Sequence, residues 1–127
     1  MSKYYIDTSA WVAYFDSNPC SEEIKNLIEN EEIMTSMITI AELADRATRN
    51  NILFSDHLKF IKNRAKILPI TIPIVLKAAT YKQEIRKKNS KFGLVDAIHY
   101  ATAKDKSTTL LTLDNDFRGI EGAEVFE

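Results

Sequence analysis

Short apolar segments alternate with longer helical patterns along this chain, and this alternation restricts the fold more than any other feature. The apolar segments are candidate strands, and they occupy residues 4–6, 33–35, 67–70, 108–113 and 123–126. The helical patterns occupy residues 8–16, 21–30, 37–49, 55–66, 74–88 and 93–104. Short strands that alternate with helices favour an α/β fold. We therefore predict a central, mostly parallel β-sheet that is flanked by helices.

Size and composition are those of an ordinary globular protein. The chain has 127 residues, of which 45% are hydrophobic and 28% are charged. A chain of this size can bury roughly two-thirds of its unfolded surface, so we expect a single domain over residues 1–127. The formal net charge of −1 excludes a chain that is basic throughout, so nucleic-acid binding would need local basic patches.

The sequence contains no candidate for membrane insertion. No apolar run approaches the ~18 residues that a spanning helix requires. The apolar stretch at the N-terminus is short and is interrupted by Asp7, which does not fit a signal peptide. We therefore expect a cytoplasmic protein with no membrane partner.

Carboxylates follow two of the predicted strands. Asp7 comes directly after residues 4–6, and Asp114 comes directly after residues 108–113, with Asp116 close behind. Ligands of parallel α/β sheets bind outside the carboxyl ends of the strands. A simpler interpretation is that Asp7 caps the next helix and that the other two acids are turn residues. The residues taken singly leave both interpretations open.

Two further carboxylates lie on helices in apolar surroundings. Glu42 lies in MITIAEL and Asp96 lies in GLVDAIHYA. An ionised carboxylate that is buried without a partner costs several kcal/mol or shifts its pKa. Arg46, four residues after Glu42, and His99, three residues after Asp96, are possible partners. Taken one at a time, such pairs are the simpler explanation.

If these acids converge, they form a strongly negative pocket that needs cations. Hard divalent ions such as Mg²⁺ and Mn²⁺ prefer carboxylate oxygens. One or two such ions can bind a phosphodiester, activate a water and stabilise the leaving oxygen. Spacing alone cannot establish this convergence, because the acids lie far apart in the sequence.

Four motifs carry a resemblance that covers residues 4 to about 117. They are YIDTSAW with Asp7, ITIAEL with Glu42, LVDAIHYATA with Asp96, and LLTLDNDF with Asp114 and Asp116. In their order and spacing they resemble the PIN domain family, specifically the VapC-type toxin ribonucleases. The resemblance implies a PIN-like α/β fold and an endoribonuclease that hydrolyses RNA phosphodiester bonds. It also implies one or two Mg²⁺ or Mn²⁺ ions in each active site.

The resemblance further implies roles for individual residues. The catalytic, metal-binding acids would be Asp7, Glu42, Asp96 and Asp114, with Asp116 as an auxiliary metal ligand. Hydroxyls that orient the carboxylates or a water would come from Thr8, Ser9 and Thr112. His99 and Tyr100 stand where members of the family often have smaller residues. We expect them to pack the helix, with a narrower pocket as the alternative.

Substrate and partners are expected as follows. A basic run before the Asp96 helix offers phosphate contacts for RNA, or is simply a solvated helix face; it includes Arg86, Lys87, Lys88 and Lys91. The resemblance implies a homodimer and a cognate antitoxin protein. Trp11, Tyr14 and Phe15 are candidates either for the core or for a partner surface.

Other functions are compatible with some or all of the same residues. A PIN nuclease that processes RNA without an antitoxin has the same acids, and the sequence hardly separates it from a toxin. A catalytically silent PIN binding module would not need the full acid set. An aspartate-based phosphatase usually has a second acid next to its nucleophile or two residues after it, but Ile6 and Ser9 occupy those positions around Asp7.

Overall fold

The computed structural model describes residues 3–17 and 22–126. Its centre is a five-stranded parallel sheet with the strand order β3-β2-β1-β4-β5. The strands are β1 (Tyr4–Ile6), β2 (Ile33–Ser36), β3 (Ala65–Leu68), β4 (Thr109–Thr112) and β5 (Ala123–Val125). This arrangement confirms the predicted α/β fold with a parallel sheet.

Helices connect the strands and cover both faces of the sheet. They are α1 (Thr8–Phe15), α2 (Glu22–Asn30), α3 (Met37–Arg49), α4 (Ser55–Arg64), α5 (Ile72–Arg86), α6 (Leu94–Asp105) and the short 3-10 helix η2 (Asn115–Phe117). The bounds of α3 are those predicted, α1 ends one residue earlier than predicted, and α6 and β4 differ from the prediction by one residue at each end. Residue 21, predicted to begin the second helix, lies outside the described residues. Among the helices described, none has the length and apolar character needed to cross a membrane.

The region between α4 and α5 differs from the prediction. The helix predicted over residues 55–66 ends at Arg64, and the strand predicted over residues 67–70 is β3 at Ala65–Leu68. Each residue of β3 pairs in parallel with one of Ile33–Ser36. This pairing with β2, which sequence alone does not show, decides where the strand begins.

Helix α5 also begins earlier than predicted, at Ile72 instead of residue 74. The side-chain oxygen of Thr71 accepts a hydrogen bond from the backbone N–H of Ile74 and caps the helix. Pro73 lies in the first turn, where its missing N–H costs nothing. The helix ends at Arg86, so the two lysines that follow lie outside it.

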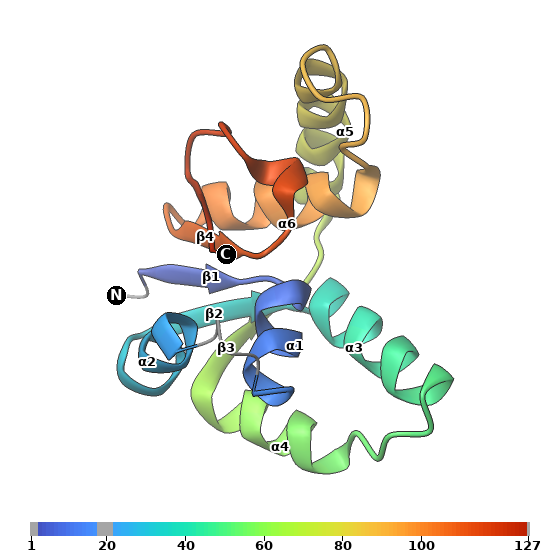
Figure 1. Ribbon diagram of the computed structural model, residues 1–127. Coiled ribbons are helices and arrows are strands. Elements are labelled where there is room, and N and C mark those ends of the chain that lie inside the picture. Colours follow the sequence, from blue (N-terminus) through green and yellow to red (C-terminus); the bar gives the residue numbers. More distant parts are fainter. Residues whose placement is uncertain (1–2, 18–21, 127) are drawn as a thin grey trace.

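Side chains of the central strands alternate between two cores. Tyr5 and Leu110 point to the face that α5 and α6 cover, whereas Ile6 and Leu111 point to the face that α1, α2 and α4 cover. Figure 1 shows β4, α5 and α6 together at the top and β2, β3 and α1–α4 below, with β1 between the two groups. The chain turns to opposite sides of the sheet at β1 and β4, which is where ligands bind in such sheets.

The aromatic residues of α1 pack in the core on the face of the sheet that α1, α2 and α4 cover. Trp11 is fully buried, and its Nε1–H donates a hydrogen bond to Oγ1 of Thr35 at 3.2 Å. Phe15 stacks on Trp11, and Tyr14 stacks on Phe60 of α4 with a centroid distance of 5.4 Å. The core interpretation of Trp11 is therefore confirmed.

Candidate functional site

A cavity of about 240 Å³ opens at the carboxyl ends of β1 and β4. Side chains from the start of α1, from α3, from α6 and from the segment after β4 line it: Asp7, Thr8, Ser9, Glu42, Asp96, His99 and Asp114. The fold thus brings together all four acids for which the family resemblance implied a catalytic role. Within the described part of the chain, the residues that line this cavity include no lysine or arginine.

A tighter acidic group extends this cavity toward η2. Carboxylate oxygens of Asp96, Asp114 and Asp116 lie within 4.8 Å of one another, and all three residues are partly buried. Burial raises the pKa of Asp96, and the negative charges of Asp114 and Asp116 raise it further. Such mutual repulsion between oxygen donors is relieved by a hard divalent cation. The donor set therefore fits Mg²⁺ or Mn²⁺.

Asp7 has a structural contact as well as a place in the cavity. Its Oδ1 accepts hydrogen bonds from the backbone N–H of Ala10 at 3.0 Å and from Oγ of Ser9 at 2.8 Å. Asp7 is therefore the N-cap of α1, as the simpler interpretation predicted. Only 4% of the residue is exposed. Burial raises the pKa of Asp7, although its hydrogen bonds with Ala10 and Ser9 oppose the rise.

Glu42 is held by two donors that reach the same oxygen. Its Oε1 accepts a hydrogen bond from Oγ1 of Thr8 at 2.5 Å and another from Nε2 of His99 at 2.8 Å. Burial alone would raise the pKa of Glu42, but the hydrogen bonds from His99 and Thr8 oppose this rise, and the pKa lies below its ordinary value.

The two ion pairs considered from helix spacing are both wrong. Arg46 pairs with Asp16 at 3.1 Å, because the end of α1 lies beside α3 and offers a carboxylate there. His99 pairs with Glu42 instead of Asp96. Asp96 accepts a hydrogen bond on Oδ2 from the backbone N–H of Gly93 at 2.9 Å, at the beginning of its own helix.

Hydroxyl groups hold the segment after β4 in place. Thr112 Oγ1 accepts a hydrogen bond from the backbone N–H of Asp114, and Ser9 Oγ accepts one from the N–H of Leu113, both at 2.9 Å. Asp114 Oδ1 in turn accepts from the N–H of Asp116 at 2.9 Å, which starts η2. Asp114 is thus both a turn residue and part of the cavity wall.

The residues behind Glu42 have contacts that the sequence did not predict. His99 is buried, and its Nδ1 lies 2.7 Å from the hydroxyl of Tyr5, which lies 2.6 Å from Oγ of Ser36. Burial raises the pKa of the Tyr5 phenol well above its ordinary value. The only available signal for His99 was its position on α6, three residues after Asp96. No local pattern marked Tyr5 or Ser36, which belong to neighbouring strands.

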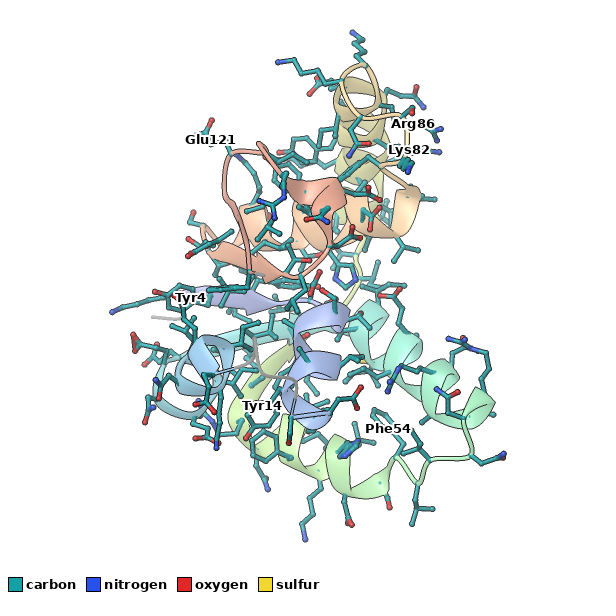
Figure 2. The ribbon with its side chains drawn as sticks, in the orientation of Figure 1. Tyr4, Tyr14, Phe54, Lys82, Arg86 and Glu121 are labelled. Atoms are coloured by element: carbon teal, nitrogen blue, oxygen red, sulfur yellow. The ribbon has the colours of Figure 1, made fainter. Side chains whose placement is uncertain are left out.

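The basic residues lie outside the acidic cavity. Arg86 ends α5, and Lys87, Lys88 and Lys91 lie in the connection to α6; all four are exposed. Figure 2 shows Lys82 and Arg86 on the same side of α5, above the beginning of α6, with Glu121 on the other side of the molecule. The connection that carries the three lysines therefore leads directly into the end of α6 that carries Asp96.

Comparisons with known proteins identify the family and support the fold. A comparison with curated protein sequences finds no match. A toxin–antitoxin complex from Klebsiella pneumoniae has a similar structure, with a TM-score of 0.79, 22% identity and coverage of 97% of both chains. VapBC2 from Rickettsia felis, solved with a promoter DNA fragment, has a TM-score of 0.75, 21% identity and coverage of 98% of both chains.

A third similar structure is Mycobacterium tuberculosis VapC20, a toxin that cleaves the sarcin–ricin loop. It has a TM-score of 0.75 and 19% identity, and the match covers 98% of this chain and 100% of that one. At these identities the likeness establishes the fold. The sequence model of the PIN domain matches residues 4–123, which is nearly the whole chain. This chain therefore belongs to the PIN domain family.

Proposed function

We propose that this protein is a Mg²⁺- or Mn²⁺-dependent endoribonuclease, a single PIN domain over residues 1–127 that acts as the toxin of a VapBC-type pair. The observation that carries the proposal is the convergence of Asp7, Glu42, Asp96 and Asp114 on one cavity, whose described lining contains no lysine or arginine. The family and the structurally similar toxin VapC20 support the same activity.

Asp96, Asp114 and Asp116 would hold a metal ion, with Asp7 and Glu42 completing the acidic set. A bound divalent ion supplies water activation and charge stabilisation at the phosphate. The contribution of the chain is preorganisation, because each of the four cavity acids has one carboxylate oxygen held by a named donor. The acids need little rearrangement when an ion and a phosphate enter.

The same contacts support hydrolysis by water over attack by the ribose 2′-hydroxyl. The second route typically needs a free histidine or lysine as the general base. Among the described residues that line the cavity, His99 is the only histidine, and both of its ring nitrogens are engaged, with Glu42 and with Tyr5. The products would then carry a 5′-phosphate and a 3′-hydroxyl.

RNA would be bound by phosphate contacts outside the acidic cavity. The exposed basic residues at the end of α5 and after it are suitably charged: Arg86, Lys87, Lys88 and Lys91. Such contacts give affinity that falls with salt and is independent of sequence. Cleavage of the sarcin–ricin loop by the structurally similar VapC20 supports this substrate class.

The proposed partners are a cognate antitoxin and a second copy of the chain, in the cytoplasm. The antitoxin is supported by the neighbouring structures, which are toxin–antitoxin complexes. The homodimer is supported by apolar side chains that α5 exposes on one face, namely Ile72, Val75 and Leu76.

The test is cleavage of a mixed RNA pool by the purified chain with Mg²⁺, with Mn²⁺ or with EDTA. Asp7→Asn is the inactive variant, and Asp45→Asn, which alters an exposed acid on α3, is the matched control. We expect cleavage that requires metal, survives in Asp45→Asn and disappears in Asp7→Asn. Products that end in 2′,3′-cyclic phosphate, or cleavage that persists in EDTA, would reject the mechanism.

A further inference from the structure

A line of buried hydrogen bonds connects the centre of the sheet to the acidic cavity. Oγ of Ser36, at the end of β2, lies 2.6 Å from the hydroxyl of Tyr5 in β1. That hydroxyl lies 2.7 Å from Nδ1 of His99, and Nε2 of His99 lies 2.8 Å from Oε1 of Glu42. The line therefore joins two strands and helices α6 and α3, and it ends on a cavity acid.

Donor and acceptor chemistry gives this line a direction. An ionised carboxylate only accepts, so Nε2 of His99 must carry the hydrogen that reaches Glu42. If Nδ1 of His99 accepts, Tyr5 donates to it and Ser36 donates to Tyr5, so every hydrogen has an acceptor. In the reverse direction the Ser36 hydroxyl hydrogen would have no acceptor, because residues 3–17 and 22–126 offer Ser36 Oγ no hydrogen-bond partner except Tyr5.

The end of the line restricts how Glu42 can be used. Thr8 and His99 both donate to Oε1, whereas Oε2 receives no hydrogen bond from the part of the chain that the structure describes. The Glu42 side chain is 38% exposed, whereas that of His99 is 4% exposed. A half-exposed glutamate has several rotamers, so a buried donor with a defined position restricts it to one.

We propose that His99 is a positioning residue, which as the neutral Nε2–H tautomer holds Oε1 of Glu42 and leaves Oε2 as the oxygen available to a divalent ion. This inference rests on the proposed function, because it assigns the ion to the same cavity. Tyr5 and Ser36 act one step further back by orienting the imidazole ring. Outer residues of this kind typically contribute about 10- to 100-fold to metal affinity.

The tautomer is tested directly by ¹H–¹⁵N NMR of the imidazole nitrogens at neutral pH without metal. The chain has only two histidines, so His57→Gln removes the other set of signals and assigns those of His99. We expect His99 to carry a hydrogen on Nε2 and none on Nδ1. A hydrogen on Nδ1 alone, or on both nitrogens, would overturn the proposed direction of the hydrogen bonds.

Positioning is tested by Mn²⁺ titration calorimetry of three variants whose folding is verified by circular dichroism. His99→Leu removes the donor, and we expect a loss of Mn²⁺ affinity of about 10-fold or more. His99→Gln places an amide N–H near the same position and should recover most of the affinity. Tyr5→Phe keeps the packing but frees the ring, and should give an intermediate loss; if His99→Leu does not fold, these two variants decide.

The outcomes separate this inference from the proposed function. Mn²⁺ binding by the unmodified chain together with unchanged affinity in the His99 and Tyr5 variants would reject the positioning role alone. No Mn²⁺ binding by the unmodified chain would reject the proposed metal site and this inference with it.

Discussion

Oδ1 of Asp7 accepts the backbone N–H of Ala10 at 3.0 Å, so one carboxylate both caps helix α1 and lines the acidic cavity. The strand β1 delivers Asp7 to the edge of the sheet, and the helix that follows holds it there. Burial of Asp7 disfavours its ionised form, whereas metal binding would require that form.

This conflict predicts that Asp7→Asn stabilises the metal-free protein while it removes activity. Asparagine keeps an oxygen for Ala10 and Ser9 but carries no buried charge. We expect the free energy of unfolding in EDTA to rise and RNA cleavage to fall by at least about 100-fold. Urea unfolding and a cleavage assay measure the two effects. A variant that is less stable than the unmodified protein would contradict this account of Asp7.

The difference in stability between the two proteins should depend on pH with a definite sign. Because burial raises the pKa of Asp7 in the folded state, the folded protein binds that proton more tightly than the unfolded chain does. Below the ordinary aspartate pKa of about 4, Asp7 is protonated in both the folded and the unfolded state. The unmodified protein then has no buried charge at this position that would destabilise it relative to the variant. As the pH rises through the raised pKa, the unmodified protein loses stability relative to Asp7→Asn.

Urea unfolding of both proteins in EDTA measures this difference. The measurements run from about pH 4, the ordinary pKa of a carboxyl group, to about pH 7. Taking the difference between the two proteins removes the opposite contribution of Glu42, whose pKa is lowered. A stability difference that stays constant over this range would contradict a raised pKa of Asp7 in the folded state.

Ser9 should contribute to stability through the segment after β4. Its Oγ accepts from the backbone N–H of Leu113 at 2.9 Å and donates to Asp7 at 2.8 Å. Ser9→Ala leaves the N–H of Leu113 without its acceptor, so we expect a loss of about 1–3 kcal/mol in the free energy of unfolding. Ser90→Ala, at an exposed position, is the matched control and should change little.

RNA binding should depend on the basic residues near α6 and not on basic charge in general. Replacing Lys87, Lys88 and Lys91 by glutamine should weaken binding to all sequences alike. The slope of log K against log salt concentration should also become less steep, by about 0.7 for each phosphate that is no longer neutralised. Lys59→Gln with Lys62→Gln is the control, because these residues are exposed on α4, far from α5 in Figure 1. Equal effects of the two sets would reject a localised RNA surface.

Much of the fold followed from local patterns, because periodicity and strand length report directly on backbone structure. The bounds of α3 were predicted without error, and the parallel sheet placed Asp7 and Asp114 at the same edge. The partner of His99 was not predictable, because Glu42 lies 57 residues away on another helix. Arg46 similarly pairs with Asp16, which follows α1, and not with its helical neighbour Glu42, because α1 packs on α3.

The central claim is that the acidic cavity binds a divalent ion, and Mn²⁺ titration calorimetry of the cavity variants tests it most directly. Asp96→Asn removes the acid shared by the cavity and the tighter acidic group, and Asp45→Asn is the exposed control. The account predicts saturable Mn²⁺ binding by the unmodified chain and by Asp45→Asn, and strongly weakened binding by Asp96→Asn. Equal affinity in all three proteins, or no binding by the unmodified chain, would contradict it.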